Sequence, residues 1–145
     1  MKRTAPIRRT PLVRSKRRLR SQSNKTHARR IHEADILWSQ LVLSLWKGRC
    51  AFCKTRHADG AHHLIFRRAL LTRHALMNGI ALCHECHGDA HEHGPEFMVW
   101  LAENYPEHFE WCGEMKAKAG GAPVHVDVEE VIEELRSALE QVAAL

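Results

Sequence analysis

Two pairs of cysteines with the same spacing, Cys50/Cys53 and Cys83/Cys86, are the first residues that could do chemistry. A Cys-x-x-Cys pair folds into a tight knuckle that presents both sulfurs to one ion, and four thiolates within tetrahedral reach suit zinc. Redox pairs of the thioredoxin type are the alternative, but neither pair lies in a βαβ pattern. We therefore expect one structural Zn²⁺ ion on all four sulfurs, which would join two distant parts of the chain.

Four histidines lie between and after these pairs: the neighbours His62 and His63, and, four residues apart, His87 and His91. Side chains at i and i+4 share one face of a helix, so the imidazoles of His87 and His91 can bind one ion together. The chain has 12 histidines, so the alternative is that these four only decorate a polar surface. The spacing favours a second metal site, at which chemistry is done, beside the structural one.

The elements that must position these side chains follow from the local pattern. Residues 61–66 form a short strand-like run, Asn78-Gly79 indicates a turn, and residues 80–82 form a second short strand. The polar segment 84–92 can be helical and starts at the second cysteine knuckle. Strand, turn, strand and helix make a ββα unit, in which we expect the histidines to converge where the first strand crosses the helix.

With these residues in view, the segment from Cys50 to Phe97 resembles the HNH endonucleases, also called ββα-metal nucleases. The order Cys-x-x-Cys, His-His, Asn, Leu-Cys-x-x-Cys-His and x-x-x-His is most similar to small members with a four-cysteine zinc, many of them phage-encoded. The resemblance covers about a third of the chain. It implies an α+β, mostly helical fold, built on a ββα-metal finger with paired zinc knuckles and packed by flanking helices.

The resemblance also implies a role for each residue. His63 would be the general base, and Asn78 would fix the loop and help to orient that base. The ligands of a catalytic divalent metal would be His62, His87 and His91. Many family members have Asp at the position of His62 and Pro shortly after the pair, where this chain has Phe66 and Arg67. The catalytic metal is therefore left open among Mg²⁺, Mn²⁺, Ni²⁺ and Zn²⁺.

Phosphodiester hydrolysis needs an activated water, stabilisation of the charge that develops on phosphate, and help for the leaving oxygen. A neutral His63 can accept a proton from water near pH 7, and a metal on three imidazoles keeps positions open for substrate oxygens. Strict strand alternation sends His62 and His63 to opposite faces, so we expect a bulge or twist that brings both to one phosphate. The predicted function is a metal-dependent DNA endonuclease. The alternative is a zinc-stabilised nucleic-acid-binding module without catalysis, which needs no base at His63.

Charge is distributed very unevenly along the chain. Residues 1–30 hold twelve Lys and Arg and no acid, whereas the rest holds ten against seventeen acids, so the net charge of +5 combines +12 with −7. Residues 1–25 have almost no periodic apolar pattern, so we expect a disordered arm that binds DNA by counterion release. Its basic residues include Arg17, Arg18 and Arg20. A solubilising or targeting tail is the alternative.

Three further arginines, Arg67, Arg68 and Arg73, lie between the two predicted strands, beside the predicted active site. An arginine fork matches the oxygens of a phosphate group well. We therefore expect Arg67 or Arg68 to clamp a phosphate, with Arg73 as a further candidate. Solvated loop charge is the alternative.

Helices are predicted around the ββα unit. Residues 25–46 have a broad apolar face at 3.6-residue spacing, which ends before Gly48 and should pack on the unit. Segments 96–104 and 106–119 are predicted to form two more helices. Residues 26–119 would then make up the nuclease domain with its flanking helices.

The end of the chain is predicted to form a linker followed by a final helix. Residues 120–126 are expected to be a linker, and residues 127–145 an acidic helix with an apolar stripe, capped by Asp127. Three roles are open for this helix: it could dock on the body, form a homodimer, or neutralise the basic arm.

Composition and the cysteines also bear on location. No apolar run follows Met1-Lys2-Arg3, so no signal peptide is expected, and residues 36–46 are too short and interrupted to span a membrane. Four of the five cysteines are assigned to zinc, which is typical of a reducing cytoplasm, here of a bacterial or phage-infected host cell. The fifth, Cys112, is expected to be a buried or bystander thiol.

Overall fold

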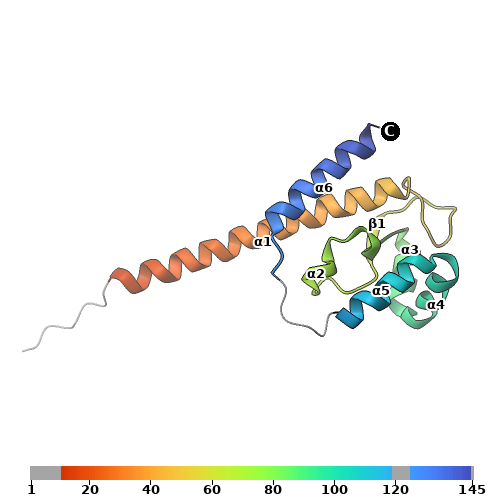
Figure 1. Cartoon of the computed structure of the whole chain (residues 1–145), viewed down its shortest axis with the longest axis horizontal. Helices are drawn as coiled ribbons and strands as arrows, with labels where there is room; N and C mark the ends of the chain where they lie inside the picture. Colours follow the sequence, from red (N-terminus) through yellow and green to blue (C-terminus); the bar gives the residue numbers. More distant parts are fainter. Residues whose placement is uncertain (1–10, 119–124, 145) are drawn as a thin grey trace, which may run out of the picture.

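A computed structural model of the chain describes residues 11–118 and 125–144, with side chains from residue 23 onward. These residues are mostly helical and contain a two-stranded antiparallel sheet, so the expected α+β class is confirmed at this level. The elements in chain order are α1 (Pro11–Leu45), β1 (Gly60–His63), α2 (Leu70–Arg73), the 3₁₀ turn η1 (Leu76–Asn78), β2 (Gly79–Leu82), α3 (His84–Glu92), α4 (Gly94–Asn104), α5 (Pro106–Lys118) and α6 (Val128–Ala143). Figure 1 shows α6 lying along the C-terminal half of α1, with the other elements gathered beside them.

The small sheet joins two halves of the core. β1 and β2 pair in a regular antiparallel register that ends with His63 opposite Gly79. Ile80 and Leu82 face a cluster formed with α3 and α4, whereas Ala81 between them faces a second cluster formed with α1 and α6. The sheet is therefore covered on both faces, and this sandwich fixes the directions in which the side chains of β1 point.

Helix α1 is much longer than predicted. It begins at Pro11, so residues 11–25 are helical where disorder was expected, and residues 1–10 lie outside the described part of the chain. Lys, Arg, Leu and Gln are good helix formers, and extending an anchored helix is far easier than nucleating a new one. Proline suits the first helical position, because its missing N–H has no partner to lose there. The N-terminal part of α1 projects away from the body (Figure 1).

The C-terminal half of α1 packs on the sheet, as predicted. Its buried side chains are those of Ala34, Trp38, Leu41 and Val42. The helix ends at Leu45, and Gly48 adopts a left-handed φ of 64° while its N–H donates to the Leu43 carbonyl at 2.9 Å. Glycine makes this reversal easy, because it has no side chain to clash in that conformation.

Helix α6 docks on the body, which was one of the three roles left open for it. Ile132 and Leu135 are buried in the cluster that contains the core residues of α1. An ion pair of 2.8 Å between Arg30 and Glu129 adds to this contact at the surface. Asp127 caps the helix as predicted, because its side chain accepts a hydrogen bond of 3.0 Å from the backbone N–H of Glu129. A homodimer stays a prediction.

The remaining helices lie close to their predicted bounds. α3 spans His84–Glu92 as predicted, α4 begins at Gly94 rather than at residue 96, and α5 ends at Lys118. Residues 120–124, which are most of the predicted linker 120–126, and residue 119 of the predicted helix lie outside the described residues. Among the described helices, none has the length and apolar character that crossing a membrane requires. Cys112 is buried in α5, and burial raises the pKa of its thiol.

The predicted Asn-Gly turn is not formed. Asn78 ends η1, and Gly79 begins β2 with an extended φ of −114°. The chain reverses instead through the longer segment 64–78, which contains α2 and η1. Glycine is needed at position 79 for another reason: a Cβ there would lie 2.5 Å from Val42 Cγ2 and 2.8 Å from Trp38 Cζ2. Its absence lets α1 approach the sheet closely.

Candidate metal centres

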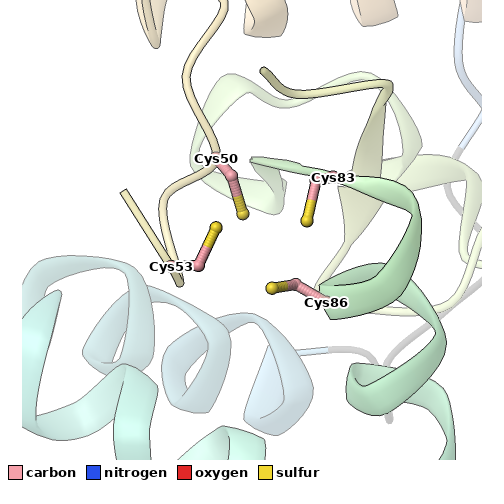
Figure 2. A group of neighbouring side chains, drawn as sticks. All are labelled: Cys50, Cys53, Cys83 and Cys86. Atoms are coloured by element: carbon pink, nitrogen blue, oxygen red, sulfur yellow. The ribbon is translucent and has the colours of Figure 1, made fainter. Parts of the chain in front are cut away.

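The four paired cysteines converge on one point. Their sulfur atoms all lie within 4.8 Å of one another, and Figure 2 shows them pointing toward a common centre. The contributing residues are Cys50, Cys53, Cys83 and Cys86. Three of them are buried and all four are free thiols. Four soft donors at this separation suit a metal ion such as zinc.

The backbone explains why the two knuckles meet. The first closes through a hydrogen bond of 2.9 Å from Lys54 N–H to the Cys50 carbonyl, with Lys54 at a φ of 60°. Ala51 N–H then donates to the Ala81 carbonyl at 2.9 Å, which attaches this knuckle to β2. The second knuckle starts where β2 ends, because Cys83 is the N-cap residue of α3. The sheet therefore brings together cysteines from distant parts of the chain.

Three histidines form a second donor set. His87 and His91 lie one turn apart on α3, as predicted, and the His62 ring centroid is 4.9 Å and 4.8 Å from theirs. One ring nitrogen of each lies within 4.8 Å of the others. Burial, together with these two neighbours, lowers the pKa of His62 to about 3. Its Nδ1 is buried and has no hydrogen-bond partner. Three imidazoles this close together, one of them neutral and with an unpaired ring nitrogen, fit a divalent metal.

His63 points to the other side of the strand, toward α1. Its ring stacks on Trp38 with centroids 3.9 Å apart, and its Nε2 lies 3.0 Å from the Arg73 carbonyl oxygen. A carbonyl oxygen can only accept, so Nε2 carries the hydrogen and Nδ1 keeps its lone pair. Burial is the main reason that the pKa of His63 falls to about 4, which leaves the ring neutral near pH 7.

The neighbouring histidines share one pocket although they lie on opposite faces of β1. The register of β1 is regular, so the bulge or twist that we predicted is not needed. The strand ends at His63, and a pocket of about 630 Å³ opens there. Its lining includes His62, His63, His87, His91, Arg67 and Lys116. A phosphate group in this pocket could therefore face both histidines.

Asn78 shapes the loop beside His63. Its side chain is fully buried, and Oδ1 accepts a hydrogen bond of 2.6 Å from Ile65 N–H. Its Nδ2 donates to the Ile65 carbonyl at 3.1 Å and to the Thr72 carbonyl at 2.9 Å. These bonds fix both ends of the loop that presents the Arg73 carbonyl to His63. Asn78 thus holds the loop whose Arg73 carbonyl contacts His63, and its role in orienting a catalytic base stays a prediction.

Two residues of α1 outside the motifs also support His63. Asp35 accepts hydrogen bonds from Arg73 at 2.7 and 2.6 Å and from His74 at 2.9 Å. Burial alone would raise the pKa of Asp35, but the bonds from Arg73 and His74 outweigh it and hold the pKa below its usual range. Trp38, which lies under His63, donates from Nε1 to the Ala75 carbonyl at 3.0 Å. The only hint of this role in the sequence was that Asp35 and Trp38 lie three residues apart on an otherwise apolar face of the helix.

The predicted phosphate-binding arginines lie in different settings. The side chain of Arg73 is only 17% exposed and its fork is used by Asp35, so Arg73 is not available as a clamp. Arg67 is 65% exposed and lines the pocket. Arg68 is exposed, with its guanidinium 5.4 Å from the centroid of the Phe66 ring. The side chains of the arm residues Arg17, Arg18 and Arg20 lie outside the described part, and their role stays a prediction.

The described residues therefore hold two compact donor sets, a neutral imidazole with a free lone pair, and cationic groups around one pocket. Such a set can bind a divalent cation, bind a phosphate group and accept a proton. No family model, no curated protein and no solved structure matches this chain.

Proposed function

We propose that this chain is a metal-dependent endonuclease of the HNH type, which hydrolyses phosphodiester bonds in DNA. One observation carries the proposal. The three-imidazole cluster and the neutral ring of His63 line the same pocket from opposite faces of one short strand. Unpaired, neutral imidazole nitrogens with strongly lowered pKa values are typical of catalytic sites rather than of solvated surfaces.

Two metal ions would have separate tasks. Zinc on the four cysteines would hold the paired knuckles together, which suits a unit whose own core is small. A second divalent ion, Mg²⁺, Mn²⁺, Ni²⁺ or Zn²⁺, would be held by His62, His87 and His91. When bound, that ion stabilises negative charge on the phosphate and on the leaving 3′ oxygen. The buried, unpaired Nδ1 of His62 supports this assignment, because a nitrogen left without any partner would destabilise the fold.

The chain's own groups would handle the proton and the substrate. His63 would accept a proton from the attacking water at Nδ1 while Nε2–H stays bonded to the Arg73 carbonyl. Burial keeps the pKa of His63 low in the free protein, and a bound phosphate would raise it by adding negative charge. Arg67 and Lys116, which line the pocket, would bind phosphate oxygens.

DNA as the substrate is supported by the charge distribution. Eight of the twelve Lys and Arg residues in the segment 1–30 lie within α1, whose N-terminal part projects from the body (Figure 1). A cationic helix of this kind binds the phosphate backbone by releasing counterions, with little dependence on base sequence. It would hold DNA while the pocket acts on one phosphodiester.

Nicking of supercoiled plasmid by the full-length, zinc-loaded protein tests the proposal. Each of the four metals is added with and without chelator, and circular dichroism at the same chelator concentration verifies that the fold persists. We expect cleavage that depends on added metal. His63→Ala should reduce it by roughly two to four orders of magnitude, the usual scale for a general base. His32→Ala, which replaces an exposed histidine of α1, is the matched control and should cleave normally.

Metal titration separates coordination from proton transfer. His62→Ala, His87→Ala and His91→Ala should recover part of their activity at high metal concentration, because two ligands remain in each variant. His63→Ala should still bind metal and DNA but should not recover. If excess metal restored the activity of His63→Ala but not that of His62→Ala, the roles assigned to these two histidines would have to be exchanged. A folded protein that binds DNA and cleaves under none of these conditions would instead be the zinc-stabilised binding module.

A further inference from the structure

The loop after β1 carries an unusually exposed aromatic side chain. Phe66 is 72% exposed, more than any other large apolar residue in the described part of the chain. Single exposed apolar side chains are common on protein surfaces, so exposure alone means little. The position of Phe66 is what distinguishes it, because this residue lines the same pocket as His62 and His63.

The backbone around Phe66 is held firmly. The preceding residue, Ile65, is bonded to Asn78 through both its N–H and its carbonyl group, at 2.6 and 3.1 Å. The carbonyl of Phe66 itself accepts a hydrogen bond of 3.0 Å from Ala69 N–H. A side chain on a fixed backbone loses little conformational freedom when it binds a ligand, so an exposed ring here is prepared for contact.

Two cationic side chains lie near this ring. The guanidinium of Arg68 lies 5.4 Å from the ring centroid, and Arg67 lines the pocket beside it. Proteins bind unpaired nucleotides with this combination, in which a base stacks on an aromatic face and neighbouring cations bind the backbone phosphates. An exposed Phe66 with Arg68 over its ring and Arg67 in the same pocket therefore matches a nucleotide better than it matches an apolar partner.

We propose that Phe66 is a stacking platform for an unpaired nucleobase next to the phosphate in the pocket, so that this chain prefers single-stranded or locally unpaired DNA. The inference rests on the proposed function, because it assigns the substrate form of the same pocket. In a continuous duplex each base is paired and stacked between its neighbours. Bringing such a base onto Phe66 requires that it leave the stack, a cost that an unpaired base does not incur.

The test measures binding, so that it does not depend on cleavage. Full-length, zinc-loaded His63→Ala protein is titrated with an oligonucleotide that contains 2-aminopurine, whose fluorescence is quenched by stacking. The same strand is used alone and in a fully paired duplex. Phe66→Ala, Phe66→Leu and Phe66→Tyr are compared in this background. Phe109→Ala is the matched control, because Phe109 is an exposed phenylalanine of α5 outside the pocket lining.

We expect Phe66→Ala to weaken single-strand binding by roughly 5- to 150-fold, the scale of one base–aromatic stack, and duplex binding by less than about twofold. Tyrosine should retain both the affinity and the quenching, and leucine should behave like alanine. Equal weakening for both forms of DNA, or full affinity with leucine, would overturn the platform. If the wild-type chain cleaves no DNA while Phe66 still controls single-strand binding, the nuclease proposal fails and the stacking site stands.

Discussion

Asp35→Asn should disable the His63 site from a distance. The Asp35 carboxylate on α1 receives two hydrogen bonds from Arg73 and one from His74. The carbonyl of the same Arg73 holds the Nε2–H of His63. Asparagine keeps the shape of the side chain but loses its negative charge and offers one acceptor oxygen instead of two. The end of α2 would therefore be held less firmly, and the Arg73 carbonyl that orients the imidazole of His63 would shift.

The magnitude can be worked from burial. Removing one partner of a buried ion pair costs about 3–5 kcal/mol, because the other charge is left without a partner. The Arg73 side chain is 17% exposed and can be partly hydrated, so we take the lower end, about 3 kcal/mol of unfolding free energy. A displacement of the base by about 1 Å would lower kcat by up to roughly a hundredfold. Asp35 does not line the pocket, but its carboxylate lies 3.8 Å from the guanidinium of Arg67, so KM is measured separately to register any effect on phosphate binding.

The assay combines urea unfolding with kcat and KM for plasmid nicking. Glu33→Gln is the matched control on the same helix: Glu33 pairs with Arg30 and Arg136 at the surface, where such pairs contribute ~0–1 kcal/mol, and its kcat should be normal. If Asp35→Asn lost about 3 kcal/mol but kept the kcat of wild type, the connection from Asp35 through Arg73 to His63 would be refuted. Unchanged stability would refute the estimate for the ion pair.

Cys83→Ser should contain no stoichiometric zinc and be largely unfolded by circular dichroism, because metal binding at such sites contributes ~10–16 kcal/mol; well-folded wild-type protein without zinc would contradict this. Deleting residues 1–24 should weaken DNA binding and flatten its dependence on salt, because fewer phosphates are neutralised, and an unchanged salt slope would mean that this segment contacts something else. Burial is the main reason that the pKa of His74 lies below its ordinary value, so the unfolded chain takes up a proton more readily than the folded one. The stability due to a neutral His74 is complete above pH ~6.5 and is lost as the pH falls through the folded pKa. Burial also lowers the pKa of His62 to about 3 and of His63 to about 4, so these residues add to the same effect. The urea midpoint should therefore decrease as the pH is lowered from 7 to 5. The decrease should be smaller in His74→Gln, and a decrease equal to that of the wild type would show that His74 contributes none of it.

The sequence by itself determined the donor sets and the local elements around them. His87 and His91 had to share a face because helix geometry places i and i+4 together, and α3 has the bounds that the pattern predicted. The two Cys-x-x-Cys pairs likewise depend on a spacing of a few residues, which local backbone geometry converts into a pair of sulfurs at one ion. Asp127 caps α6 for the same kind of short-range reason.

Only the tertiary structure decided which residues contact His63 and which arginines remain unpaired enough to bind a phosphate group. Trp38 stacks on His63, and Asp35 accepts hydrogen bonds from Arg73. In each pair the two residues are more than twenty positions apart in the sequence. Both contacts depend on the close approach of α1 to the sheet, which the missing side chain of Gly79 allows. A local pattern cannot show which charged or aromatic side chains will meet when two elements pack, because the packing geometry is set by the whole core. For that reason the sequence pattern predicted Arg73 as a candidate phosphate clamp and indicated no role for Asp35.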